Sequence, residues 1–356
     1  DWENTWTTAN CSATNSNVPI YDIANSLRFN DDDSAYLSRT PSSAGNRKTW
    51  TWSWWVKRGD FDYQTIFGTN NPSGVNGAYE NLDEISFGGW GDIYYRYKEG
   101  GLAQYYFNST ALLRDPSAWY HIVIIKDTSN VTQSERLKVY LNGSRITDYS
   151  TLGDWSQNNE GLINKAENHD IGKSAGTSNY FDGYLSNIHF IDGQALSSTS
   201  FGQFNGTTGQ WEAKDYAWAY GTNWFHLAFS NSWNLWEDFS GNTNNWTSTN
   251  LDANDQILDH PSNNFATLNP LIYDSDDSTI LSEGNLKIWA ITWDAGRVSD
   301  FAVSSGKWYW EVYLISGWAN GRYTGIIDAW SEALNDSGYQ GGFTSGEYGI
   351  MYDGLD

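Results

Sequence analysis

The stretch TWTWSWWVK, residues 49–57, decides the fold class. Alternate side chains of an extended chain point to opposite sides, so Trp50, Trp52 and Trp54 share one face. Thr51, Ser53 and the remaining alternate residues occupy the other face, which is more polar. A hydrophobic period of two predicts a half-buried β-strand.

The same strand chemistry recurs along the chain. WYHIVIIKD (119–127) is apolar on both faces and predicts a central strand. RLKVYLNGSRIT (136–147) contains Asn142-Gly143, the pair that supplies the two left-handed residues of a type I′ hairpin turn. Many short strands between turn signals, with almost no helical period, predict an all-β sandwich.

A further strand is expected in FDGYLSNIHFIDG (181–193). Tyr184, Ile188 and Phe190 are separated by even numbers of residues, so we expect them to share one face. The Asn- and Asp-rich residues 231–264 show no clean period. We interpret them as a polar connector packed by a few aromatic side chains.

The composition excludes several classes of protein. Lys and Arg number 20 against 43 Asp and Glu, a formal charge of −23, so the chain repels nucleic acid and anionic membrane. No apolar run has the length of a membrane span. Cys11 is the only cysteine, which excludes a disulfide within the chain. The 21 Trp, 23 Tyr and 15 Phe provide ample apolar surface for a core instead.

Four segments carry a resemblance to a known family. SLRFNDDDSAYLSRTPSSAGNRKTWTWSWWVKRG (26–59), RDPSAWYHIVIIKDT (114–128), RLKVYLNGSRIT (136–147) and YFDGYLSNIHFIDGQALSSTSFGQF (180–204) resemble laminin G-like, concanavalin A-like domains of marine phage tail-fibre and virion proteins. The resemblance implies a jelly-roll sandwich over residues 26–230. It also implies a recognition module on the outside of a particle, hence a virion-surface or extracellular location.

A second resemblance begins near residue 265. The run Gly306 to Val312, GKWYWEV, resembles the core of a SPRY domain, and its pattern predicts a strand within 304–316. We therefore expect an N-terminal polar arm (1–25), the jelly roll (26–230), the connector (231–264) and an incomplete SPRY-like sandwich (265–356). Too few strands remain for a whole SPRY domain, so we expect the C-terminus to be incomplete.

Two loops are candidates for glycan binding, because sugar rings stack on aromatic side chains while amides and carboxylates take the hydroxyl groups. FGGWGDIYYRY (87–97) and GDWSQNNEG (153–161) offer such residues among glycines and polar side chains. The alternative is that these aromatic residues belong to the core or to a subunit interface. The candidate residues are Trp90, Asp92, Tyr94, Tyr95, Trp155, Gln157, Asn158 and Asn159.

Carboxylates in turns are candidates for Ca²⁺, which takes six to eight oxygen ligands. Asp31, Asp32 and Asp33 share one turn, and Asp182 precedes Gly183 at another. Turn formation by Asp without a metal is the alternative.

Catalysis is not expected. Concanavalin A-like glucanases carry paired carboxylates on one face of a strand, but Glu80, Asp83 and Glu84 are spaced so that one strand cannot place all three on one face. The five histidines are scattered and form no helical zinc pair, so we expect satisfied or exposed histidines.

These observations lead to three hypotheses. The first is a non-enzymatic tail-fibre or capsid-fibre protein that binds cell-surface glycan or a neighbouring subunit. The second is a structural decoration, cement or extracellular filament subunit, and the third, resting on fold alone, is a carbohydrate-active hydrolase. The partners expected are polysaccharide or other virion proteins, with the chain in a homo-oligomer or a larger assembly.

Overall fold

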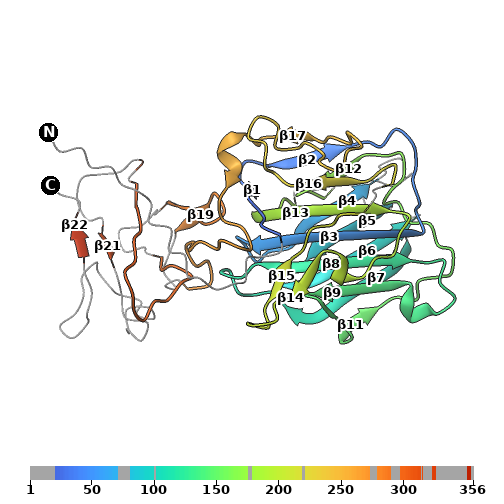
Figure 1. Ribbon diagram of the computed structural model, residues 1–356, viewed down its shortest axis with the longest axis horizontal. Coiled ribbons are helices and arrows are strands. Elements are labelled where there is room, and N and C mark those ends of the chain that lie inside the picture. Colours follow the sequence, from blue (N-terminus) through green and yellow to red (C-terminus); the bar gives the residue numbers. More distant parts are fainter. Residues whose placement is uncertain are drawn as a thin grey trace.

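The computed structural model describes residues 21–70, 81–99, 102–174, 179–218, 221–272, 279–289, 297–313, 315, 323–325 and 351–353. Over these residues the regular elements are β-strands and three short 3₁₀ turns, and no α-helix occurs among them. The predicted all-β fold class is therefore confirmed. Two sheets pack as layers of a jelly-roll sandwich (Figure 1).

The first sheet has the order β10-β9-β8-β3-β13-β1-β18, and β16 also pairs with β13. The predicted strands at 49–57, 119–127 and 136–147 all lie in it, and Asn142 and Gly143 both have positive φ, as the predicted turn requires. Its strands are β1 (Ser26–Phe29), β3 (Thr49–Arg58), β8 (Tyr120–Asp127), β9 (Leu137–Leu141), β10 (Ser144–Arg145), β13 (Gly183–Asp192), β16 (Phe225–Leu227) and β18 (Gln256–Ile257).

The second sheet has the order β11-β7-β6-β5-β4-β12-β2-β17. Its strands are β2 (Tyr36–Arg39), β4 (Gln64–Asn70), β5 (Leu82–Phe87), β6 (Asp92–Glu99), β7 (Leu102–Leu112), β11 (Tyr149–Leu152), β12 (His169–Ile171) and β17 (Thr247–Thr249). Three two-stranded sheets are separate from these: β14 (Gly202–Phe204) with β15 (Trp211–Ala213), β19 (Ile280–Ser282) with β20 (Lys287–Trp289), and β21 (Tyr323–Gly325) with β22 (Met351–Asp353). The 3₁₀ turns are η1 (Gln133–Glu135), η2 (Ser198–Ser200) and η3 (Ala253–Asp255).

The core lies between the sheets and is built on aromatic rings. Trp50, Trp52 and Trp54 of β3 are completely buried, and all face the second sheet. Trp52 stacks on Phe67 of β4 with ring centroids 4.0 Å apart and planes 6° apart. This contact joins the two layers directly.

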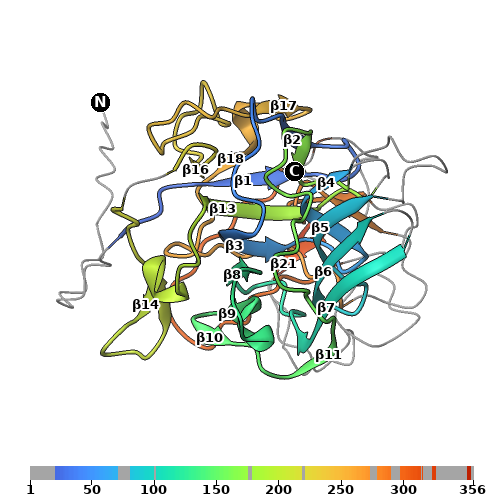
Figure 2. The ribbon, with the colours of Figure 1, turned by 90° about the vertical axis from the view of Figure 1, so that its right-hand side faces the viewer.

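The expectation that β3 is half-buried is wrong. Thr51, Ser53, Trp55 and Lys57, on its outer face, are at most 3% exposed. Figure 2 shows the β14 hairpin lying on the outer side of the first sheet. A second apolar cluster there, with Phe201 and Trp224, covers that side. The sequence of β3 alone does not reveal this cover, because Phe201 and Trp224 lie more than 140 positions away.

The expected common face of Tyr184, Ile188 and Phe190 is also wrong. Ile188 and Phe190 belong to the core between the sheets, whereas Tyr184 packs on the outer side with Trp119. The pairing of β13 with β3 shifts register between Ser186 and His189, and Asn187 has φ of 46°. A β-bulge of this kind breaks the alternation of side chains and turns the second half of the strand over.

The segment interpreted as a connector supplies strands to the sandwich. β17 pairs with β2, and β18 pairs with β1, so residues 231–264 extend both sheets. Leu235, Trp246 and Leu251 enter the core. Of the expected N-terminal arm, residues 1–20 lie outside the described part; Ile23 is buried in the outer cluster of Trp55.

The strand predicted within 304–316 is not formed over residues 304–313, which contradicts that expectation. Trp308 and Trp310, within this run, are 60% and 48% exposed. A strand needs a neighbour to satisfy its backbone groups, and no described strand pairs with this run. The remainder of the SPRY-like region lies largely outside the described residues. No helix among the described residues has the length and apolarity to cross a membrane.

Candidate functional site

The two loops predicted to bind glycan lie at opposite ends of the sandwich. The turn that carries Trp90 is adjacent to Arg58, the last residue of β3, because a Cβ on Gly91 would lie 3.3 Å from the Arg58 guanidinium. Asn158 donates its N–H to the Thr128 carbonyl, and Thr128 donates to the carbonyl of Lys48, which precedes β3. Ten residues of strand span roughly 30 Å, so the loops do not form one site.

Two of the predicted aromatic residues are core residues. Tyr95 is completely buried, and Trp155 is 2% exposed; their rings stack with centroids 5.1 Å apart. Asp92 is also buried, its carboxylate facing Gly88. Gln157 and Asn158 are exposed, and Asn159 is partly exposed. Trp155, the aromatic residue of this loop, is buried in the core and is therefore not available for a sugar ring to stack on.

Trp90 is the accessible aromatic residue of the first loop, with 76% of its surface exposed. Arg114 holds Trp90 in position. The Arg114 Nε–H donates to the Trp90 carbonyl at 2.8 Å, and the Arg114 guanidinium lies 5.9 Å from the centroid of the indole ring. Gly91 follows with φ of +89°, a conformation that disfavours a side chain. The ring is therefore presented outward on a supported turn.

Tyr94, from the same hairpin, belongs to a cluster on the outer face of the second sheet. We define the tyrosine cluster as Tyr63, Tyr94 and Tyr106, all partly exposed. The centroid of the Tyr94 ring is 6.4 Å from that of Tyr63 and 5.9 Å from that of Tyr106. Asn108 is the cross-strand partner of Tyr94 and places an amide beside it.

Arg96 and Glu84 anchor the cluster. Arg96 pairs with the Glu84 carboxylate and lies 5.7 Å over the Tyr63 ring. Tyr63 donates to Glu84 at 2.8 Å, and Ser174 donates to its other oxygen at 2.9 Å. These contacts fix the rings in place. The sequence analysis missed Tyr63, Tyr106 and Arg96, because only the β4–β7 register brings them beside Tyr94.

The carboxylates considered for catalysis are not paired. Asp83 and Glu84 are neighbours in β5 and point to opposite faces; Asp83 accepts two backbone N–H groups inside the sandwich, and Glu84 is bound on the outer face. Glu80 lies outside the described residues. No pair of carboxylates from this segment shares a face among the residues described.

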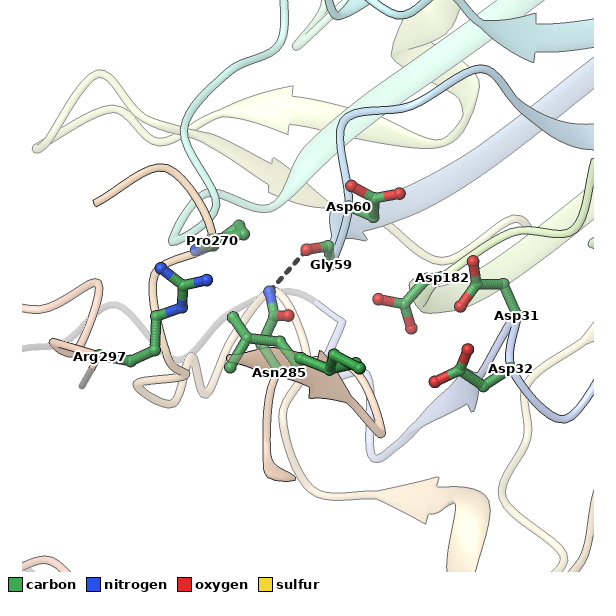
Figure 3. Close-up of a pocket in the computed structure, with 10 residues that line it drawn as sticks. Asp31, Asp32, Gly59, Asp60, Asp182, Pro270, Asn285 and Arg297 are labelled. Carbon is green, nitrogen blue, oxygen red and sulfur yellow. Dashed lines mark hydrogen bonds between the residues drawn. The ribbon is translucent and has the colours of Figure 1, made fainter. Parts of the chain in front are cut away.

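The acidic residues predicted for Ca²⁺ do meet, in part, at one end of the sandwich. The register pairs Phe29 with Gly183 and Gly183 with Arg58, so the ends of β1 and β3 and the start of β13 coincide. They bring together the turn of Asp31 and Asp32, the segment Gly59–Asp60, and Asp182. We call the resulting cavity of about 230 Å³ the acidic pocket (Figure 3).

Asp182 is the least solvated carboxylate of the acidic pocket. It is 4% exposed, and its Oδ1 has no hydrogen-bond partner within the described part of the protein. Burial, reinforced by the negative charges of Asp31 and Asp60, raises the pKa of Asp182 well above its usual range. Figure 3 shows the side chains of Asp31, Asp32 and Asp182 grouped on one side of the pocket, and a Cβ on Gly59 would lie 2.4 Å from Asp182 Oδ2.

The pocket is acidic but is not an assembled ligand set. No three His, Cys, Asp or Glu side chains among the described residues are close enough to hold a metal ion. Asp33 does not line the pocket. Its carboxylate accepts a hydrogen bond from Asn30 Nδ2 at 2.9 Å and stabilises the turn. Asp31 and Asp32 are exposed, so their side chains have the freedom to close on an ion.

Comparison with known proteins agrees with this architecture. Residues 30–200 match the laminin G-type family model of the concanavalin A-like lectin/glucanases superfamily. The sandwich therefore has a concanavalin A-like, laminin G-like fold. No curated protein shows significant sequence similarity to the chain.

The solved structures that match the chain include one from an animal and two from bacteria. A heptameric SAP-like pentraxin from Limulus polyphemus is 16% identical, with a TM-score of 0.35, over 50% of this chain and 80% of the pentraxin. A putative carbohydrate binding protein from Bacteroides ovatus is 17% identical, with a TM-score of 0.36, over 65% of this chain and 61% of its own. The Ruminococcus gnavus sialidase CBM40 bound to α2,3-sialyllactose is 12% identical, with a TM-score of 0.35, over 49% of this chain and 92% of the CBM40 chain.

Proposed function

We propose that this protein is a non-enzymatic component of a virion surface, a tail fibre or a capsid-associated fibre, that binds cell-surface glycan. The observations that carry the proposal are the exposed indole of Trp90, at the turn between β5 and β6, and the tyrosine cluster, which includes Tyr94 of β6; we call these side chains together the aromatic surface. It combines an outward-facing indole, three partly exposed phenol rings and neighbouring amide and guanidinium groups. The laminin G-like and SPRY-like resemblances and the acidic net charge support the same setting.

The physical basis is stacking on a fixed platform. A pyranose ring has an apolar face, and an aromatic side chain that is already rigid loses little entropy when a sugar packs on it. Arg114 holds the Trp90 turn, and Glu84 with Arg96 holds Tyr63. Loops and strand ends on a rigid sandwich are also where binding residues concentrate.

Replacing Trp90 by alanine should weaken glycan binding about 30-fold, because losing a central aromatic contact costs about 2 kcal/mol. The measurement is isothermal titration of the wild type and the variant with the strongest ligand from a glycan array. Trp233→Ala is the matched control, since Trp233 is 94% exposed and lies outside the aromatic surface. Equal losses in the two variants, or none in either, would overturn the assignment of the surface.

A second candidate function is attachment to a neighbouring subunit, as a decoration, cement or filament protein. The favouring observation is the exposed run with Trp308, Tyr309 and Trp310, since aromatic residues are enriched at protein interfaces. Light scattering on the intact chain discriminates between the two functions. A concentration-dependent oligomer that Trp308→Ser disrupts, together with no glycan binding, would favour assembly.

We also propose that the acidic pocket binds Ca²⁺ through Asp31, Asp32 and Asp182, with Asp60 as a further charge. The buried, unpartnered Oδ1 of Asp182 fits a bound cation, which would offset the repulsion among these carboxylates. Asp33 was predicted as a ligand, but it contacts Asn30 and is left out of the proposed set.

Addition of EDTA should lower the melting temperature, because a ligand at 100 times its Kd contributes about 2.7 kcal/mol of native-state stability. Asp182→Asn should abolish the EDTA effect and lower the melting temperature in Ca²⁺. If the pocket binds no ion, Asp182→Asn should instead raise the melting temperature, because it removes a buried charge that repels Asp31 and Asp60. Differential scanning calorimetry separates these results.

A further inference from the structure

Two oppositely charged groups lie completely buried between the sheets. Lys126, near the end of β8, follows Ile122 and Ile124 along the inward face of the first sheet; Asp83, on β5, precedes the inward-facing Ile85 of the second. Both side chains are 0% exposed. A lysine and an aspartate are rarely fully buried unless they are paired.

The two groups are close but incompletely paired. Asp83 Oδ2 accepts the backbone N–H groups of Leu162 at 2.7 Å and Ile163 at 3.0 Å. Asp83 Oδ1 and Lys126 Nζ have no hydrogen-bond partner among the described residues, and no described ion pair includes either residue. Leaving buried charged groups unsatisfied in this way is costly.

Gly161 marks the space between them. A Cβ at this position would lie 2.3 Å from Asp83 Oδ2 and 2.4 Å from Lys126 Nζ. Any larger residue would therefore separate the carboxyl group from the amine. Glycine leaves the approach open.

The surroundings exclude water, and burial disfavours the charged form of each group. Lys126 Nζ lies 5.7 Å from the Tyr97 ring centroid and 5.2 Å from that of Trp155, both of them buried rings. Burial lowers the pKa of Lys126 to about 8 and raises the pKa of Asp83. Amide formation takes place between a neutral amine and a protonated carboxyl group, and burial increases the share of both forms relative to solvent-exposed groups; a dry site also disfavours the reverse hydrolysis.

We propose that Lys126 and Asp83 condense into an amide cross-link that joins β8 of the first sheet to β5 of the second. The neutral Nζ attacks Asp83 Cγ, and the N–H groups of Leu162 and Ile163 hold the negative charge that develops on Oδ2. The Cγ–Oδ1 bond then breaks. Oδ1 leaves as water with the acid's own proton and one proton from the amine, and the remaining amine proton stays on the amide nitrogen.

Tyr95 is a positioning residue for this step. Its buried hydroxyl lies beside the Asp83 carboxyl, whose charge helps to raise the pKa of the phenol. The hydroxyl can relay a proton to the departing oxygen and take one back, so it is unchanged overall. The condensation needs no oxidant, reductant or added co-reactant, and it does not depend on glycan binding.

The test is the intact mass of the full chain, purified and measured under denaturing conditions. The cross-linked protein should be lighter than its sequence mass by about 18 Da, the mass of one water molecule. Fragmentation should show the Lys126 and Asp83 peptides joined by an amide, which distinguishes the cross-link from dehydration at another aspartate. Lys126→Arg and Asp83→Ala should each have the full mass calculated from their sequence. Lys173→Arg, a control at a partly exposed lysine, should still be lighter by the mass of one water molecule.

An unmodified mass for the folded wild type after prolonged incubation at neutral pH would overturn the proposal, whatever the variants do. A loss of one water mass without the joined peptides would also overturn it. Tyr95→Phe supplies a further readout: the cross-link should still form, but at least tenfold more slowly after refolding. An unchanged rate would remove Tyr95 from the step.

Discussion

Replacing Trp52 by alanine should destabilise the protein by roughly 3–5 kcal/mol, the range for a buried aromatic residue removed from a core. Trp52 is completely buried and stacks on Phe67 across the sheet interface. It also lies within 6.0 Å, centroid to centroid, of Phe190 and Phe225. The substitution therefore opens a cavity where four rings from both sheets meet. Urea unfolding followed by near-ultraviolet circular dichroism measures the loss.

Trp233→Ala provides the comparison at an exposed tryptophan and should change stability by less than about 0.5 kcal/mol. Comparable losses in Trp52→Ala and Trp233→Ala would contradict the account of the core. A small effect of Trp52→Ala alone would mean that the sheets pack without the stacked Trp52–Phe67 contact.

Acidification from pH 7 to pH 4.5 should reduce the stability that His169 contributes by about 2–3 kcal/mol. His169 is buried; its Nε2 accepts the Asn164 backbone N–H at 2.9 Å, which requires the neutral ring. Burial lowers its pKa to about 4, below the value of about 6.5 in an unfolded chain. The unfolded chain then binds more protons between these values, so the contribution is complete above pH 6.5 and is lost as pH falls toward 4.

The other buried histidines should also contribute less stability as the pH falls, because burial lowers their pKa values in the folded state. Trp211 donates its indole N–H to His121 Nδ1 at 2.9 Å, and burial lowers the pKa of His121 to about 3. His226 stacks on His189 with centroids 4.1 Å apart, and burial lowers the pKa of both rings. The raised pKa values of Asp182 and Asp60 act in the opposite direction, because their contributions are lost as pH rises.

A difference measurement isolates the histidine effect from these carboxyl groups. The free energy of unfolding is measured by urea for the wild type and for His169→Gln at several pH values between 7 and 4.5. The advantage of the wild type should shrink as pH falls. Gln157→Ala, at an exposed residue, should track the wild type throughout. A constant difference between the wild type and His169→Gln would contradict a neutral buried His169.

The fold could be predicted from local pattern because the long strands of the first sheet carry their own signals. The tryptophan alternation of β3, the doubly apolar β8 and the Asn142-Gly143 turn all required only neighbouring residues. The buried outer face of β3 could not be predicted in this way. Its cover comes from Phe201, Trp211 and Trp224, which are distant in the sequence.

The candidate site was harder to predict than the fold for the same reason. Trp90 and Trp155 both sit among glycines and polar residues, yet one is exposed and the other stacks on Tyr95 in the core. Local sequence does not distinguish these environments. Tyr63 and Tyr106 join Tyr94 only through strand register, and the bulge at Asn187 reverses the face of Tyr184 without a strong signal in the sequence.

The most direct test of the central claim, that this sandwich binds glycan, is a glycan array probed with the intact protein and competed with soluble polysaccharide from candidate host cells. The account predicts saturable binding to at least one class of glycan, which the matching polysaccharide competes away. Absence of binding on the array and in solution, with a correctly folded protein, would contradict it.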